Sequence, residues 1–287
     1  MQVYKSFNDY RGKLKKELDI KVIYTDLDGT LLNDMGCLIK DVEGKFFYDA
    51  VSLFKKIEKK GWDLVLVSGR SRVQLRYNAM LMGVKNFIPE LGCEMVYDLG
   101  REVHVTFDSA KLNYKITKGG KDLVEIIKIF SKAFPGKIES QLEWSMGRSY
   151  NALFFGDIDI DRANSLLIEN GYEGLELVDN GFSKLVSLDI DVEHLRIYNL
   201  IPRGVDKASA IKLDRKIRKL VKNNCIALGD SVEDIKMAKE VGAFFLMKNA
   251  IDRDGRVAEL IKDYDNIFVT SKIMNHGWTE VMDYLLS

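Results

Sequence analysis

The sequence is poor in cysteine, proline and histidine, and neither charge sign is in excess. It holds three of each of these residues in 287 positions, and 43 lysines and arginines balance 43 aspartates and glutamates. The cysteines are widely spaced without a CxxC pair, which argues against a disulfide framework or a zinc site and favours a reducing compartment. Balanced charge without a basic cluster argues against nucleic acid as a partner.

Long apolar runs are also missing. No run reaches the length of a membrane-spanning helix, and residues 1–20 are too polar and charged for a signal peptide. We therefore expect a cytoplasmic protein without a membrane partner. Neither a Walker loop nor a dinucleotide-binding glycine motif is present. The sequence leaves the oligomeric state and the role of residues 1–20 open.

The apolar runs that are present have the length of β-strands. They are residues 22–24, 64–67, 225–228, 244–247 and 267–269. These runs do not alternate between apolar and polar positions, and amphipathic helical patterns such as residues 50–57 lie between them. Buried strands separated by such helices predict an α/β fold with a parallel sheet that is covered on both faces.

The middle of the chain has a different pattern. Residues 121–134 and 161–170 predict helices, and residues 151–160 include a predicted strand. Asn180-Gly181 lies between two apolar runs, which predicts a hairpin. Helices mixed with antiparallel strands are typical of a small α+β unit.

This α+β unit is predicted to interrupt the parallel fold. We expect residues 111–194 to form an inserted domain, and residues 1–110 and 195–287 to form the core. The chain has no repeats, low-complexity segments or Pro-rich linkers that would indicate another division.

Polar residues follow three of the predicted strands at the point where each strand ends. They are Asp26 and Asp28 after the first, Ser68, Gly69 and Arg70 after the second, and Asp230, Ser231 and Asp234 after the third. Ligands of open parallel sheets bind beyond the carboxyl ends of the strands, so we expect these residues to meet. Crowded carboxylates repel one another, and a hard cation such as Mg²⁺ with oxygen ligands removes that repulsion.

The same residues are suited to phosphoryl transfer. Lys207, near the start of a predicted helix, supplies positive charge for an anionic substrate, which we interpret as a phosphate ester. A carboxylate can attack phosphorus and form an aspartyl-phosphate, while magnesium and lysine neutralise the charge that shifts during transfer. A second aspartate two residues further on can act as general acid and then as general base.

Four motifs resemble those of the haloacid dehalogenase superfamily of phosphatases, in the same order. They are "DLDGTLL" from Asp26, Ser68 in "VSGR", Lys207 in "GVDKASA", and "GDSVED" around Asp230. The insert between the second and third motifs resembles the subclass with a large α/β cap, which includes Cof-type, sucrose-phosphate and mannosyl-3-phosphoglycerate phosphatases. The resemblance implies a Rossmann-like core with an inserted cap.

The resemblance also implies a role for each motif residue. Asp26 would be the nucleophile, Asp28 the acid/base, Ser68 and Gly69 phosphate ligands, and Lys207 the bridge between phosphoryl group and nucleophile. Asp230 would bind Mg²⁺ with the Asp26 carboxylate and the Asp28 main-chain carbonyl, supported by Asp234 and Ser231.

Two positions depart from the family pattern. Glu233 precedes Asp234 where the family often has asparagine. This departure leaves open which contacts are made to the residues that bind the metal. "ELGCE", Glu90 to Glu94, replaces the "NGA" that often follows the second motif. This second departure leaves open the contacts on the substrate side.

Each motif also has a plainer interpretation. "DLDGT" could be a tight turn in which Thr30 caps a helix, although this does not explain Asp26. Ser68 alone could be a turn residue, and Lys207 alone a solvated one. Arg70 could lie on the surface or contact phosphate or the cap, and residues 147–151 could face substrate or solvent.

Three functions are compatible with the sequence. The first is a Mg²⁺-dependent phosphatase of a small phosphorylated metabolite, most simply a sugar phosphate. The second is a phosphotransferase or mutase of the phosphomannomutase type, and the third is a non-catalytic phosphometabolite-binding protein. The physiological substrate depends on cap residues that the sequence pattern does not identify.

Overall fold

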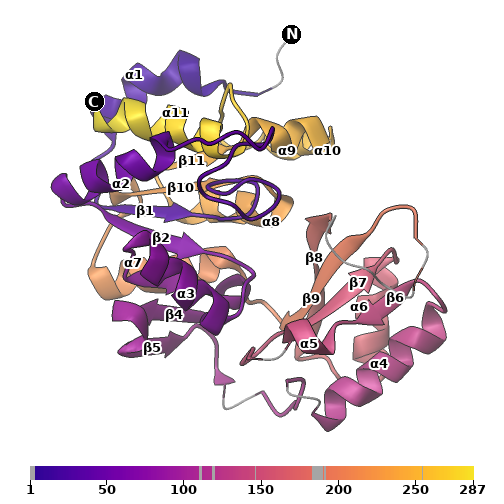
Figure 1. Cartoon of the computed structure of the whole chain (residues 1–287). Coiled ribbons are helices and arrows are strands. Elements are labelled where there is room, and N and C mark those ends of the chain that lie inside the picture. The colour runs from indigo at the N-terminus through magenta and orange to yellow at the C-terminus, as the bar shows by residue number, and fades with distance from the viewer. Residues whose placement is uncertain are drawn as a thin grey trace.

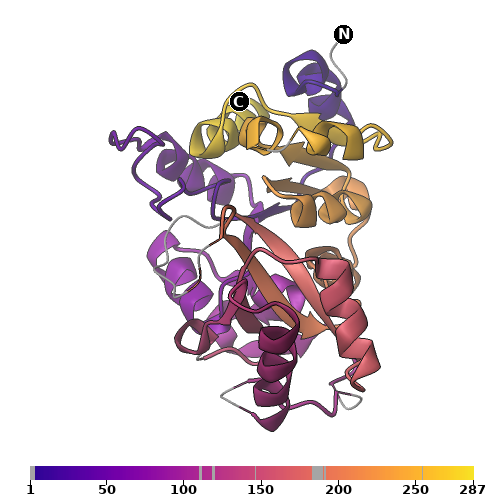
Figure 2. The same ribbon diagram turned by 90° about the vertical axis from the view of Figure 1, so that its right-hand side faces the viewer.

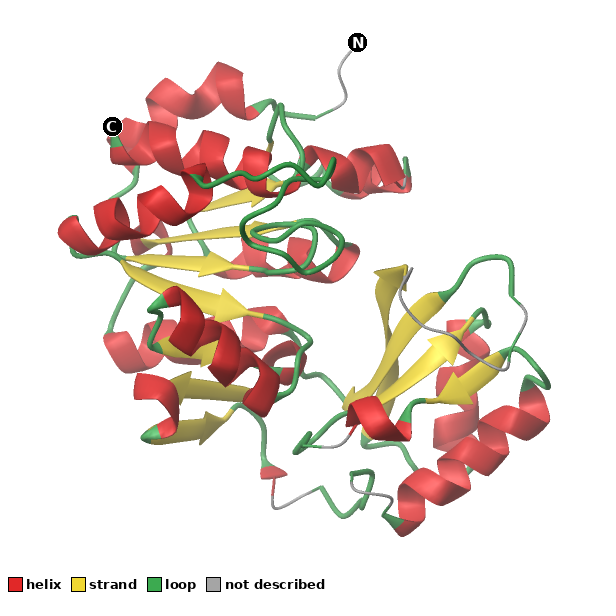
Figure 3. Ribbon diagram, viewed as in Figure 1, coloured by secondary structure: helices red, strands yellow, loops and turns green. Residues whose placement is uncertain are grey.

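The residues that the structure describes form two β-sheets, one with eight strands and one with four (Figures 1 and 3). The structure is a computed structural model that describes residues 4–109, 112–117, 120–145, 147–182, 190, 192–253 and 255–287. The eight-stranded sheet has the order β12-β11-β10-β1-β2-β3-β4-β5. Its strands are β1 (Val22–Thr25), β2 (Asp63–Val67), β3 (Asn86–Ile88), β4 (Glu94–Tyr97), β5 (Glu102–Val105), β10 (Cys225–Gly229), β11 (Ala243–Leu246) and β12 (Ile267–Val269).

Six neighbouring strands of this sheet, from β12 to β3, are parallel. Strands β4 and β5 extend its edge in antiparallel pairing. All residues of β1, β10, β11 and β12 are buried, which accounts for the absence of apolar–polar alternation in their sequences. The predicted α/β fold with a mainly parallel sheet is confirmed.

Helices cover both faces of the eight-stranded sheet. One face packs against α1 (Phe7–Glu17), α2 (Asp49–Lys59), α3 (Arg72–Met82) and α11 (Met274–Leu286). The other packs against α7 (Lys207–Arg218), α8 (Val232–Ile235), α9 (Lys248–Arg253) and α10 (Arg256–Leu260). Adjacent strand residues such as Ile23 and Tyr24 point into opposite layers, as the strand repeat of two residues requires.

The four-stranded sheet is antiparallel and has the order β6-β7-β9-β8. Its strands are β6 (Ile138–Ser140), β7 (Ala152–Gly156), β8 (Leu175–Phe182) and β9 (Arg196–Pro202). Helices α4 (Lys121–Ala133) and α6 (Ile160–Glu169) cover the face turned away from the core sheet, and the short helix α5 (Leu142–Ser145) precedes β7 (Figure 2). The helices expected at residues 121–134 and 161–170 correspond to α4 and α6.

The second sheet extends past the boundary expected for the insert. That boundary was set at residue 194, but β9 pairs with β7 and β8 as far as Pro202. An apolar strand carries no local signal for the sheet that it joins, so the sequence assigned these residues to the core. We therefore propose that the insert ends near Pro202.

The predicted Asn180-Gly181 hairpin also differs from the structure. Both residues lie within β8, where the pairing with β9 shifts register between Asp179 and Phe182. Gly181 has a φ of +93°, and its amide donates to Asp179 Oδ1 at 2.9 Å. Residues 184–189 of the expected second strand lie outside the described residues.

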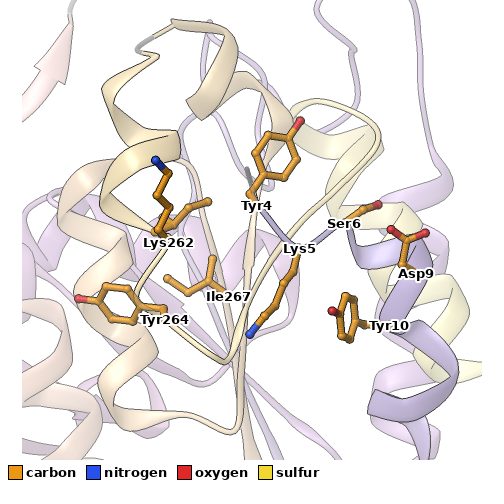
Figure 4. A pocket seen from close by; sticks show the side chains of 9 residues that line it. Tyr4, Lys5, Ser6, Asp9, Tyr10, Lys262, Tyr264 and Ile267 are labelled. Atoms are coloured by element: carbon orange, nitrogen blue, oxygen red, sulfur yellow. The ribbon is translucent and has the colours of Figure 1, made fainter. Parts of the chain in front are cut away.

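The N-terminal segment is part of the core. Ser6 bridges Val269 at the edge strand β12, and Phe7 is fully buried against the rings of Phe245 and Tyr284. The segment forms one side of an open pocket of about 350 Å³, which is lined by Tyr4, Lys5, Tyr10, Lys262, Tyr264 and neighbouring residues (Figure 4). In the described ranges, no helix combines the length and apolar character needed to cross a membrane.

Removal of the Phe7 ring should destabilise the core, because it leaves a cavity where three aromatic rings meet. We expect Phe7→Ala to lower the free energy of unfolding by about 3–5 kcal/mol. Urea denaturation measures this change, with the exposed Lys13→Ala as control. A loss below about 1 kcal/mol would show that α1 is not an integral part of the core.

Candidate active site

The carboxyl ends of three adjacent strands bring the predicted site residues together. Strands β10, β1 and β2 are neighbours in the sheet, and Asp230, Asp26 and Ser68 follow them directly. Carboxylate oxygens of Asp26, Asp230 and Asp234 lie within 4.8 Å of one another. The strands point toward the side on which the four-stranded sheet lies (Figure 3).

Lys207 connects two of these carboxylates. Its Nζ donates to Asp26 Oδ1 at 2.7 Å and to Asp234 Oδ1 at 2.6 Å, and its side chain is 3% exposed. The lysine is the first residue of α7, whose start is fixed by a capping box between Asp206 and Ser209. Burial lowers the pKa of Lys207, but Asp234 and Asp26 more than offset this effect and raise it, so the amine stays protonated.

Asp234 is held by hydrogen bonds to the turn that follows β10. Its Oδ2 accepts hydrogen bonds from the amides of Asp230 and Ser231 and from Ser231 Oγ, at 2.7–3.1 Å. Ser231 Oγ in turn accepts from the Asp234 amide at 3.2 Å, and these contacts form a capping box at the start of α8. Asp234 is therefore engaged at both oxygens, Oδ1 by Lys207 and Oδ2 by the turn after β10. The preceding Glu233 pairs with Lys236 at 2.7 Å.

Asp230 is held by residues that the sequence reading missed. Its Oδ2 accepts from Asn249 Nδ2 at 2.9 Å and from Arg253 at 3.0 Å. Both residues belong to α9, which follows β11, the strand next to β10. The rule that identified the other site residues, that polar groups follow the ends of adjacent strands, could have found them.

The turn after Asp26 is shaped by the site. Gly29 has a φ of +84°, and a Cβ on it would lie 2.2 Å from Asp230 Oδ2. The Thr30 hydroxyl lies 3.4 Å from Asp230 Oδ1. The next helix begins only at Asp49, so the alternative that Thr30 caps a helix is wrong.

Like charges crowd in this site. Burial raises the pKa values of Asp26 and Asp230, and the neighbouring carboxylates raise them further, with Lys207 opposing the effect for both residues. A divalent cation would remove this repulsion, and carboxylate oxygens are the ligands that Mg²⁺ prefers. The donor set therefore fits the expected metal.

Asp28 lies apart from the carboxylate cluster. Its side chain is about half exposed and accepts two hydrogen bonds from Arg70, from Nε at 3.0 Å and from Nη2 at 2.5 Å. Arg70 also donates to Asn78 at 3.0 Å. The arginine therefore contacts the expected acid/base. The expected contribution of the Asp28 main-chain carbonyl to metal binding stays a prediction.

The Ser68-Gly69 loop is buried at Ser68 and contacts the insert at Gly69. Ser68 is 3% exposed, and its Oγ accepts from the Arg70 amide at 3.2 Å. The carbonyl of Gly69 accepts from Arg148 Nη1 at 2.8 Å. Arg148 belongs to the 147–151 segment and is 4% exposed, so at this residue the segment is not a solvent loop.

The "ELGCE" segment forms part of the junction between the two sheets. Glu90 is fully buried, and its carboxylate accepts from the amides of Ser149 and Tyr150. Glu94 Oε1 accepts from Arg72 at 3.1 Å, while its buried Oε2 has no hydrogen-bond partner among the described residues. Burial raises the pKa of Glu94 to about 7; Arg72 opposes this effect and Glu90 adds to it.

Comparisons with known proteins agree with this architecture. A family model described as haloacid dehalogenase-like hydrolase matches residues 23–267. The glucosyl-3-phosphoglycerate/mannosyl-3-phosphoglycerate phosphatase of Persephonella marina is 28% identical over 246 residues, which cover 77% of this chain and 82% of that protein. The 5-amino-6-(5-phospho-D-ribitylamino)uracil phosphatase of Bacillus subtilis is 28% identical over 273 residues, which cover 91% and 97%.

A solved structure shows the same fold. The sucrose-phosphatase from Synechocystis, in complex with sucrose and phosphate, matches with a TM-score of 0.63 at 13% identity. The match covers 92% of this chain and 97% of that protein. At this identity the likeness concerns the fold alone.

The buried Glu94 should make stability depend on pH. Its pKa is raised from 4.5 to about 7, so the native state holds a proton that the unfolded chain releases, and stability falls as pH rises between these values. We expect Glu94→Gln to reduce this loss between pH 5 and pH 8 by roughly 1–3 kcal/mol. Urea denaturation at both pH values tests this, with the exposed Glu58→Gln as control. An equal pH dependence in wild type and Glu94→Gln would contradict the assignment.

Proposed function

The chain belongs to the haloacid dehalogenase-like hydrolases and is a hydrolase of phosphoric monoesters, and on this premise we propose the finer activity. We propose a Mg²⁺-dependent phosphatase that acts on a small phosphorylated metabolite, a sugar phosphate, through an aspartyl-phosphate on Asp26. The cluster of Asp26, Lys207, Asp230 and Asp234 supports this proposal.

Asp26 is the residue we assign as nucleophile. Lys207 fixes its Oδ1, which leaves Oδ2 as the oxygen assigned to attack phosphorus. A covalent carboxyl-phosphate divides hydrolysis into two easier displacements. Asp26 and Asp230 would hold Mg²⁺, which when bound neutralises charge on the phosphoryl oxygens.

Asp28 is assigned as the acid and base of the two displacements. In the first, the bond between phosphorus and the leaving oxygen breaks, and Asp28 gives its proton to that oxygen. In the second, Asp28 takes a proton from water, whose oxygen attacks phosphorus and releases phosphate from Asp26. Both oxygens of the Asp28 carboxylate accept from Arg70, which fixes the direction of the side chain.

The remaining motif residues are assigned to phosphate binding. Ser68 and Gly69 lie on the loop after β2, and Lys207 carries the buried positive charge. Together they would hold phosphoryl oxygens in line with Asp26, which is the main contribution of a protein to phosphoryl transfer.

The relatives support a small phosphorylated substrate. One is named as a phosphatase of glucosyl- and mannosyl-3-phosphoglycerate, and the matching solved structure contains sucrose and phosphate. We propose that the insert closes over the site, excludes bulk water and selects the leaving group. A cytoplasmic location remains part of the proposal.

Asp26→Asn should abolish turnover, because an amide cannot form the aspartyl-phosphate. We expect kcat with p-nitrophenyl phosphate and Mg²⁺ to fall by at least about a thousandfold. The control is Asp161→Asn, an exposed change on α6 that should leave kcat unchanged. A folded Asp26→Asn protein with wild-type turnover would refute the nucleophile assignment.

Removal of the metal should stop the reaction without unfolding the protein. We expect EDTA to abolish phosphate release and excess Mg²⁺ to restore it, with an unchanged circular dichroism spectrum.

The same assay, repeated with a sugar phosphate and a second sugar as acceptor, separates hydrolysis from transfer. Transfer to the acceptor in place of free phosphate would favour the phosphotransferase alternative.

A further inference from the structure

Three consecutive carbonyl groups of the loop after β2 are tied by hydrogen bonds. Ser68 O accepts from the Leu91 amide at 3.2 Å, and Arg70 O accepts from the Glu90 amide at 2.9 Å. Between them, Gly69 O accepts from Arg148 Nη1 at 2.8 Å. Two of these bonds come from the core and one comes from the insert, so docking of the insert completes the set.

The turn that provides the two core donors is itself constrained. Glu90, Leu91 and Gly92 have φ values of +51°, +56° and +103°, a left-handed conformation that is costly for the first two residues. A Cβ on Gly92 would lie 2.2 Å from the carbonyl oxygen of Asp206, the residue before Lys207. The turn at residues 90–92 therefore lies between the loop after β2 and the start of α7.

The insert is attached to the same turn. The Glu90 carboxylate accepts from the Ser149 amide at 2.9 and 3.1 Å and from the Tyr150 amide at 2.9 Å. These bonds anchor the segment that carries Arg148. Glu90 and Arg148 are 0% and 4% exposed, so water competes little for these contacts.

A second element of the insert reaches the same glycine. A Cβ on Gly69 would lie 2.9 Å from Asn180 Nδ2, which projects from β8. Gly69 is thus approached by β8 and by the Arg148 segment, two parts of the insert that are distant in sequence. This convergence makes Gly69 the point at which the insert meets the phosphate-binding loop.

The Gly69–Arg70 peptide group transmits the contact to Ser68. Its carbonyl oxygen accepts from Arg148, and its N–H, on Arg70, donates to Ser68 Oγ at 3.2 Å. A peptide group is planar, so fixing its oxygen also fixes the direction of its N–H. Because Ser68 Oγ accepts this bond, the hydroxyl proton is directed elsewhere and can be donated to a phosphoryl oxygen.

We propose that Arg148 is a positioning residue of the insert, which orients the Ser68 hydroxyl toward the phosphoryl group through the Gly69–Arg70 peptide. The proposal rests on the proposed function, since it takes the phosphoryl group to be the partner of Ser68. Docking of the insert then completes the phosphate site, and phosphate binds most tightly to the docked form.

A double-mutant cycle between Arg148 and Ser68 tests this path. We expect Arg148→Met to lower kcat/KM for p-nitrophenyl phosphate by about 10- to 100-fold and to raise the inhibition constant of inorganic phosphate. In a Ser68→Ala background the same change should cost less than about threefold, because the hydroxyl that Arg148 orients is absent. Arg148→Lys, which retains a donor, should recover part of the activity.

The controls separate this path from a general loss of structure. Arg162→Met removes an exposed ion pair with Glu169 on α6 and should leave all constants unchanged. If Arg148→Met does not fold, Glu90→Gln, which weakens the anchor of the Arg148 segment, is carried through the same cycle. An equal loss in both Ser68 backgrounds, or no loss at all, would overturn the proposal. An inactive wild type would instead refute the proposed function.

Discussion

The site depends on one buried ammonium group placed between carboxylates. Lys207 neutralises part of the charge of Asp26 and Asp234, and burying these groups without each other would cost several kcal/mol apiece. With Asp230 included, three carboxylates face the cationic side chains of Lys207 and Arg253, and a bound cation would balance the negative charge that remains. Lys207 and the proposed metal would therefore form one electrostatic unit, in which each favours the ionised form of Asp26.

The fold packs Lys207 and the carboxylates closely together. The strands β10, β1 and β2 bring the carboxylates to one edge, and the capped start of α7 delivers the lysine from the far part of the chain. Two motif glycines make the approach possible. A Cβ on Gly29 would meet Asp230, and a Cβ on Gly229 would lie 2.3 Å from the Cβ of Asp234. Glycine at these two positions is a packing requirement of the site.

The sequence was sufficient to predict the parallel sheet and the meeting of Asp26, Asp230 and Asp234, because both follow from local patterns. Apolar strands without alternation indicate burial on both faces, and polar residues after their ends must share an edge. Asn249 and Arg253 obey the same rule but follow a strand with no recognised motif.

Other features depend on tertiary contacts that have no local signal. The pairing of β9 with the second sheet, and the place of Asn180-Gly181 inside β8, are decided by partners distant in sequence. The contact between Arg148 and Gly69 joins residues 79 positions apart. The departure at Glu90 was visible in the sequence, yet its role as anchor of the insert could be read only from the structure.

The covalent step is the central claim, and trapping it is the most direct measurement. A rapid acid quench during turnover, followed by borohydride reduction and peptide mass spectrometry, converts an aspartyl-phosphate to homoserine at the modified residue. The account predicts homoserine at position 26 in the presence of substrate and Mg²⁺. Steady turnover with aspartate 26 unmodified, or with the label at another residue, would contradict it.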